Sequence, residues 1–273
     1  MTVDKPARMP TFFIPHGGGP CFFMDWTLMG GEADTWNDLE AFLRGLQSTL
    51  PEKPKGILVI SGHWEEKVFT ASTTESPGMI YDYTGFPPHT YELSYPAKGH
   101  PQLAEKIVRL LKAAGLPATT DNTRGFDHGV FVPLLLIDPP AGIPVVTLSL
   151  KTDLDPEEHL AAGRALASLR DEGILVVGSG MSYHDMRGFR TSAATRPSAT
   201  FDAWLTQAVA SDPAARWQAL THWSEAPAGR QSHPREEHLL PLMVAAGAGH
   251  DAAGSRPFTD NVMMADISAF RFD

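Results

Sequence analysis

The chain contains the stretch LVVGSGMSYH (residues 175–184), in which an apolar run passes through two glycines and ends at His184. The same order, a short apolar run that ends at a histidine, occurs in FFIPH (12–16) and LVISGH (58–63). Open α/β sheets place their sites beyond the carboxyl ends of the strands, so His16, His63 and His184 are expected at one sheet edge. A buried core histidine explains any one of them but explains all three less well, which favours a metal site.

Apolar runs alternate with amphipathic helical patterns along the chain. Leu103, Ile107 and Leu110 share one face of a helix that begins at Pro101 and ends at Gly115. Similar patterns predict strands over 11–14, 56–60, 68–72, 144–150 and 174–177, and helices over 33–50, 101–115, 156–173, 201–210 and 232–246. This alternation predicts an α/β fold and a single catalytic domain over residues 1–273. Its central sheet is mostly parallel and is flanked by helices on both faces.

Composition excludes several classes of function. The 273 residues carry a formal net charge of -10, which argues against binding to nucleic acid or to an anionic membrane surface. The single cysteine, Cys21, rules out a disulfide within the chain and a cysteine-rich zinc site. Residues 1–10 have no signal-peptide pattern, and no apolar run approaches the ~20 residues of a membrane span. We therefore expect a cytoplasmic enzyme whose metal ligands are imidazoles and carboxylates. The oligomeric state is not indicated.

Three motifs lack the spacing of the catalytic signatures they resemble. The glycines at 17–19 are followed by neither Lys-Ser/Thr nor an immediate helix, so they are expected to admit a ligand close to the backbone rather than to form a phosphate loop. GSG (178–180) lacks the Gly-x-Ser-x-Gly spacing of a serine hydrolase. HPREEH (233–238) is not the His-Glu-x-x-His of a zinc protease. We expect His238 in the first or second turn of the helix over 232–246.

Other residues near these motifs have candidate roles. His128, in GFDHG (125–129), is an acid/base candidate, although its neighbour Asp127 is not thereby its partner. Glu65 or Glu66 could hydrogen-bond the second ring nitrogen of His63, or could simply be exposed. Residues 78–98 are expected to form a long ordered loop that covers the site. The remaining histidines considered are expected to be structural or solvated: His89, His100, His159, His222 and His250.

Taken together, the motifs resemble the class III extradiol ring-cleavage dioxygenases, and within them the 4,5-DOPA dioxygenase type related to the LigB family. The resemblance runs in order from about residue 10 to residue 242. It is carried by PHG (15–17), SGHW (61–64), YDYTGFP (81–87), YPAKG (95–99), GFDHG (125–129), GMSYH (180–184) and EHLLPL (237–242). The segment GGGP (17–20) departs from the Gly-Ser-Pro common in the DOPA-type branch.

The resemblance implies that His16, His63 and His238 hold the metal. It also implies that His128 and His184 act as acid/base groups beside it, and some relatives place the residue matching His184 near the metal as a further ligand. Better-known LigB enzymes have a glutamate as the third ligand, where this sequence offers His238 with Glu236 and Glu237 beside it.

The implied activity is Fe(II)-dependent opening of a catechol-type ring by O₂, with a small aromatic diol, DOPA-like or related, as substrate. Three protein ligands leave coordination positions open, as in non-haem Fe(II) oxygenases. A three-histidine site would also bind zinc, so zinc in the purified protein would be compatible with an iron enzyme. Two other classes stay open. One is a zinc-dependent hydrolase that uses metal-bound hydroxide, and the other is a non-enzymatic, Memo-like binding protein on the same scaffold.

Overall fold

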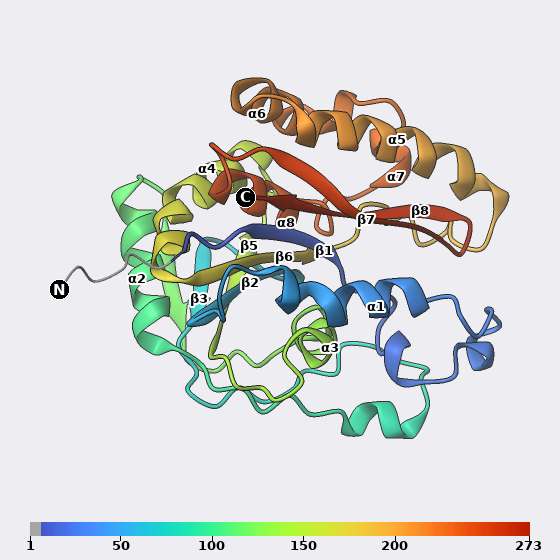
Figure 1. The fold of residues 1–273 in the computed structure, drawn as a ribbon, viewed down its shortest axis with the longest axis horizontal. Coiled ribbons are helices and arrows are strands. Elements are labelled where there is room, and N and C mark those ends of the chain that lie inside the picture. The colour runs from blue at the N-terminus through green and yellow to red at the C-terminus, as the bar shows by residue number, and fades with distance from the viewer. Residues whose placement is uncertain (1–6) are drawn as a thin grey trace.

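The computed structural model describes residues 7–273, and eight strands of this part form one mixed sheet (Figure 1). Their order is β4-β3-β5-β2-β6-β1-β8-β7. The strands are β1 (Thr11–Pro15), β2 (Gly56–Glu66), β3 (Phe69–Ser72), β4 (Ala118–Asp121), β5 (Val145–Lys151), β6 (Ile174–Gly180), β7 (Gly254–Val262) and β8 (Ala265–Phe272). The four central strands, β5, β2, β6 and β1, run parallel, whereas β3 against β5 and the β7–β8 hairpin against β1 are antiparallel.

Side-chain alternation on the central strands divides the core into two layers. Phe13 and Leu58 belong to one buried cluster, while Phe12, Ile14 and Val59 belong to the other. Both faces of these strands are therefore dry, which explains why they appear in the sequence as continuous apolar runs. The predicted α/β fold with a mostly parallel sheet is confirmed, and the structure adds antiparallel pairing towards both edges.

Helices cover both faces of the sheet (Figure 1). On one face lie α2 (Pro101–Ala113), α4 (Pro156–Leu166) and α8 (Leu240–Ala248), with α5 (Ser192–Ala210), α6 (Pro213–Thr221) and the short α7 (Gly229–Ser232) packed outside them and against the hairpin. On the other face lie α1 (Asn37–Gly45), α3 (His128–Ile137) and part of the loop over 78–98. The loop contains one short 3₁₀ turn, Pro88–Glu92.

Two helices differ from the predictions for physical reasons. The helix predicted over 232–246 begins too early: α8 spans only Leu240–Ala248, and His238 lies in the turn before it rather than in its first turns. The backbone carbonyl of His238 accepts a bond from the Met181 N–H, so this residue is tied to the end of β6 rather than to a helix. Helix α3 was not predicted because it is apolar on every side, and without a polar face it shows no helical period.

The ends of other elements also differ from the predicted ones. Helix α5 begins nine residues before the predicted Phe201, the helix over 156–173 becomes 3₁₀ after Leu166, and the C-terminal hairpin was not assigned from the sequence.

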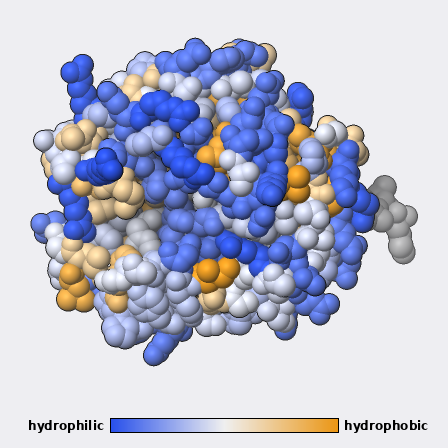
Figure 2. All heavy atoms as spheres, turned by 180° about the vertical axis from the view of Figure 1, so that it is seen from behind, coloured by the Kyte–Doolittle hydropathy of each residue, from blue (hydrophilic) through white to orange (hydrophobic). Residues whose placement is uncertain are grey.

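The visible surface is mostly hydrophilic. On the face shown in Figure 2, hydrophilic residues predominate and hydrophobic residues form small, separate groups. Within residues 7–273, the helices are all too short or too polar to span a bilayer. The prediction about a signal peptide over residues 1–10 rests largely on residues 1–6, which lie outside the described part of the chain.

Candidate metal centre

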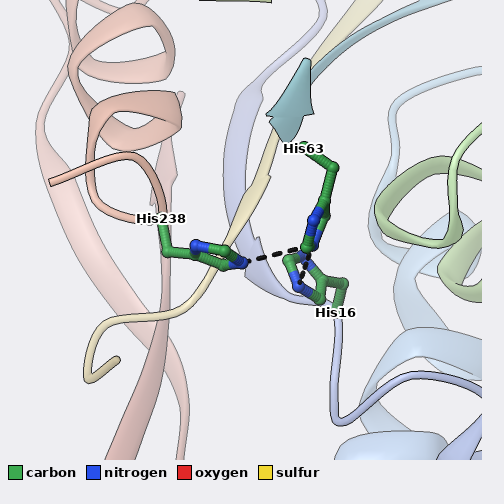
Figure 3. Close-up of side chains that lie close together, drawn as sticks. All are labelled: His16, His63 and His238. Atoms are coloured by element: carbon green, nitrogen blue, oxygen red, sulfur yellow. Dashed lines mark hydrogen bonds between the residues drawn. The ribbon is translucent and has the colours of Figure 1, made fainter. Parts of the chain in front are cut away.

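Three histidine side chains converge at the carboxyl edge of the parallel strands (Figure 3). His16 follows β1, His63 lies near the end of β2, and His238 precedes α8. The Nε2 atom of His63 lies 3.2 Å from the Nε2 atoms of both His16 and His238. One potential ligand atom from each residue lies within 4.8 Å of the others, which is the arrangement a single ion would require.

The partners of the opposite ring nitrogens fix how these imidazoles are protonated. The Ser179 hydroxyl donates to the Gly129 carbonyl, so it accepts from His16 Nδ1–H at 3.2 Å. Glu237 Oε1 accepts from His238 Nδ1–H at 2.9 Å, and an Asp82 oxygen lies 3.5 Å from His63 Nδ1. With each Nδ1 holding the proton, all three Nε2 atoms present lone pairs to one another.

Burial keeps these rings neutral. Burial first, and then the charges of neighbouring histidines, hold the pKa values of His16 and His238 well below the ordinary value, although Glu237 partly opposes the shift at His238. The same causes lower the pKa of His63 to about 4. Three neutral imidazoles with converging lone pairs repel one another unless a cation lies between them. The residues present therefore fit a divalent metal ion.

Glycines on the strands let the segment that carries His238 lie this close. A Cβ atom at Gly180 would fall 2.1 Å from the carbonyl oxygen of His238, and one at Gly62 would fall 2.9 Å from that of Glu237. Any side chain at Gly180 would push the 237–239 turn away from the strand ends. The glycines that resembled a nucleophile elbow thus have a packing role.

His128 forms a pair with an acid from the long loop. Its Nδ1 and its backbone N–H both bond to Asp82 Oδ1, at 2.8 Å and 3.0 Å. Burial opposes ionisation of Asp82, but the bonds from His128 outweigh it and lower the pKa of the carboxyl to about 2. The His128 ring centroid lies 4.0 Å from that of His63, and both rings line the same cavity as His16 and His238.

His184 lies on the other side of the three histidines. Its ring stacks on His238 with centroids 3.4 Å apart, and its Nδ1 lies 3.2 Å from the same Glu237 oxygen that accepts from His238. Burial opposes ionisation of Glu237, but the bonds from His184 and His238 outweigh it and hold its pKa below the ordinary range. The structure brings all five predicted histidines together, with His184 outside the group of three.

The carboxylates nearest the histidines are not the ones expected from the sequence. Glu65 pairs with Arg235 at 2.6 Å and Glu66 accepts from Trp64, so neither orients His63. Asp82 does so instead. Its only sequence signal was its position in YDYTGFP, a segment noted through the family resemblance. Asp82 and Glu237 each form a further possible ligand group with two histidines, but their bonds to those histidines account for both acids without an ion.

Asp127 is a structural neighbour of the site rather than a partner of His128. It accepts from the Ser61 hydroxyl at 2.7 Å and from Arg124 at 2.8 Å, and so joins β2 to the start of α3.

A cavity of about 510 Å³ opens beside the five histidines. Its walls come from the glycine loop, from the segment 26–36, from residues 82–86 of the long loop and from the tip of the β7–β8 hairpin. The loop therefore covers the site, as predicted. Gly17, Gly18 and Gly19 line this cavity, which agrees with a loop that admits a ligand close to the backbone. Aromatic rings also pack on it: a Cβ at Gly18 would lie 3.3 Å from both Trp26 and Trp36, and one at Gly19 would lie 3.0 Å from Phe86.

The histidines expected to be structural have local roles. His159 is fully buried and accepts from the Lys151 N–H, whereas His100 caps the first turn of α2. His233, for which no role was predicted, is also fully buried and donates to the Ser182 carbonyl.

Comparison with known proteins agrees with this geometry. Residues 10–270 match the family model described as the catalytic LigB subunit of aromatic ring-opening dioxygenase. Similar proteins include 4,5-DOPA dioxygenase extradiol of Beta vulgaris (38% identical, 87% of this chain and 86% of the relative) and of Escherichia coli (34%, 94% and 90%). Dioxygenase tasH of Hapsidospora irregularis is 36% identical over 96% of this chain and 84% of its own length.

The fold has a solved counterpart as well. The crystal structure of an uncharacterized protein from Escherichia coli K12 superimposes with a TM-score of 0.76 at 28% identity and covers 97% of this chain and 100% of its own. An α/β sheet with three converging histidines at its carboxyl edge fits the class of proteins that hold a metal ion at this edge. The chain belongs to the LigB family of extradiol aromatic ring-opening dioxygenases.

Proposed function

We propose that this protein is a non-haem Fe(II)-dependent extradiol dioxygenase that opens the ring of a small catechol-type diol with O₂. The observation that carries the proposal is the convergence of the Nε2 atoms of His16, His63 and His238, in which His63 Nε2 lies 3.2 Å from each of the other two. The Nδ1 atoms of His16 and His238 are hydrogen-bonded to Ser179 and Glu237, which is the usual arrangement of a histidine metal ligand.

Three ligands on one side of an ion would leave positions open on the side of the 510 Å³ cavity. Ferrous iron, when bound, supplies the electron transfer that lets O₂ react with an aromatic diol. Zinc would occupy the same nitrogens, but it has no accessible second oxidation state, so it would inhibit rather than support turnover.

The residues around the ligands are placed to handle protons. The Nδ1–H of His128 is committed to Asp82, which leaves Nε2 as the base that takes a proton from a diol hydroxyl in the cavity. Asp82 stays ionised and stabilises the imidazolium that forms. His184, oriented by Glu237, lies across the site and is placed to act as the second proton-transfer group, the acid that donates a proton during ring opening. The two histidines thus form separate acid and base positions on opposite sides of the three ligands.

An anaerobic reconstitution tests the proposal. The purified protein is loaded with Fe(II), mixed with a panel of catechols and then exposed to O₂, with a zinc-loaded sample as control. We expect stoichiometric oxygen uptake and a yellow ring-opened product from the iron sample only. Failure to consume O₂ across a broad panel would refute it. Turnover under argon would indicate the hydrolase, and a protein that retains no metal would indicate a binding role.

A further inference from the structure

The outer wall of the active-site cavity is apolar. Met29, Met186, Phe189 and Met263 line it beyond the histidines. Within residues 7–273, Met186 is among the exposed large apolar side chains, at 69%, and it lines this cavity. Exposing such a side chain to water is unfavourable, so its position beside Phe189 and Met263 on one wall marks a surface that contacts an apolar ligand.

The backbone that holds this wall is strained. Met263 and Met264 form the turn between β7 and β8, with φ values of 51° and 68°, and Arg190, whose N–H bonds to the Met263 carbonyl at 2.8 Å, has a φ of 66°. Hairpin turns of this kind favour glycine or asparagine, because other side chains are strained in the left-handed region. Strained residues of this sort cluster at ligand-binding sites, where the side chain has a use that outweighs its cost.

The cavity has little to offer an anionic substituent. The cavity is lined by a guanidinium group, that of Arg190, which donates a hydrogen bond to the Met29 carbonyl. Its Nε atom lies 3.4 Å from the Met263 sulfur, and its Cζ atom lies 5.7 Å from the centre of the Trp26 ring. Arg190 and Met263 also line the adjoining cavity, which carries four carboxylates: Glu32, Asp34, Asp38 and Asp260. A negative charge placed here would lie near the carboxylates of the adjoining cavity, and Arg190 is held by the Met29 carbonyl and the Met263 sulfur rather than pointing a free fork at the substituent.

We propose that the substrate is a catechol with an uncharged, apolar ring substituent, and that Met263 determines how that substituent is accommodated. This inference rests on the proposed function. The diol would face the histidines, and the substituent would lie against Met186, Phe189 and Met263 towards the opening. The preferred substrate would thus differ from an amino-acid catechol such as DOPA.

Equilibrium binding without O₂ tests the inference. The Fe(II)-loaded protein is titrated anaerobically with catechol, 4-methylcatechol, 4-propylcatechol and 3-(3,4-dihydroxyphenyl)propionate, and quenching of the fluorescence of Trp26 and Trp36, which line the cavity, reports binding. We expect the Kd to fall roughly threefold with each added methylene. The propionate should bind at least tenfold more weakly than 4-propylcatechol.

Two glycine variants separate the side chain from the strained turn. Met263→Gly removes the side chain from the wall and relieves the backbone strain, so the protein should fold with an unchanged or higher Tm. The fall in Kd with each added methylene should then be less than about 1.5-fold. Met264→Gly relieves the same kind of strain in the next residue, which lines only the adjoining cavity. This variant should show the same fall in Kd with each added methylene as the wild type.

The outcomes distinguish this inference from the proposed reaction. Three results would overturn the inference even if the rings are opened. They are a wild-type Kd that does not change with the length of the substituent, a propionate that binds more tightly than 4-propylcatechol, and an equal loss of the chain-length dependence in both variants. The expected binding series in a protein that opens no ring would support the inference and refute the dioxygenase reaction alone.

Discussion

At the scale of single residues, the site depends on where three protons lie. The Nδ1 atoms of His16 and His238 are hydrogen-bonded to Ser179 and Glu237, and an Asp82 oxygen lies 3.5 Å from the Nδ1 atom of His63. These three neighbours come from different parts of the chain, so each imidazole has its own contact at Nδ1. Loss of one acceptor should therefore weaken the site, whereas loss of one imidazole should destroy it.

Replacement of His238 by alanine should abolish retention of iron, because two imidazoles remain. His128→Ala should retain a full equivalent of iron but lose at least 100-fold in kcat, because its role is proton transfer. Metal content after gel filtration and oxygen uptake on the same samples check both statements. Equal metal loss in the two variants would show that His128 is a ligand.

Asp82→Asn keeps the size of the side chain but removes the charge that would stabilise a protonated His128. We expect kcat to fall roughly 10- to 100-fold with iron still bound, because His63 Nδ1 lies 3.5 Å from Asp82 and depends on it less than His128 does. Steady-state kinetics and metal analysis separate the two effects. Asp127→Asn is the matched control: it should lower stability, since Asp127 bonds to Ser61 and Arg124, without the same loss of rate in the folded enzyme.

At the scale of elements, the approach of the 237–239 turn to β6 positions the third ligand. Gly180→Ala would place a Cβ atom 2.1 Å from the His238 carbonyl oxygen, so the turn must move. We expect a loss of about 1–3 kcal/mol in the free energy of unfolding, together with weaker metal binding. Gly45→Ala, at the end of α1 with no atom within 4 Å of the new Cβ, should leave metal binding unchanged and should not lower the free energy of unfolding, since alanine is the better helix former. Urea denaturation and metal titration of the two variants test this; an unchanged metal affinity in Gly180→Ala would contradict it.

Local signals predicted the central elements well and the ends of the chain poorly. The buried strands β1, β2, β5 and β6 appear as apolar runs, and α2 and α4 have caps and stripes that a single sequence reveals. Helix α3 and the start of α8 lack polar faces, so their limits are set by what packs around them. His238 was misplaced for this reason: the backbone bond from Met181, 57 residues earlier, leaves no trace in the local pattern.

At the scale of the whole molecule, buried neutral histidines make stability depend on pH. Burial lowers the pKa of His233 to about 3, whereas in the unfolded chain it titrates near ~6.5. Between these values the unfolded state binds more protons. His233 therefore costs no stability above pH 6.5 and costs progressively more as the pH falls towards 3.

His233→Gln should reduce this dependence, because the glutamine amide can still donate to the Ser182 carbonyl but does not titrate. Between pH 7 and pH 5 the free energy of unfolding should fall by roughly 2 kcal/mol less in the variant than in the wild type. Urea titrations at the two pH values, at matched metal content, give this difference. Parallel pH profiles would mean that His233 does not stay neutral in the folded protein.

The sequence by itself indicated the α/β class and the parallel central strands through its apolar runs, and the five histidines of the candidate site through short motifs and the family resemblance that they carry, because runs and motifs are local properties. Only the tertiary structure decided which acids serve those histidines and which apolar side chains bound the cavity. Asp82 reaches His128 from 46 residues away, Glu237 joins His184 to His238, and the β7–β8 turn brings Met263 to the wall. Contacts of this kind depend on how distant segments pack, and a single sequence carries no local pattern for them.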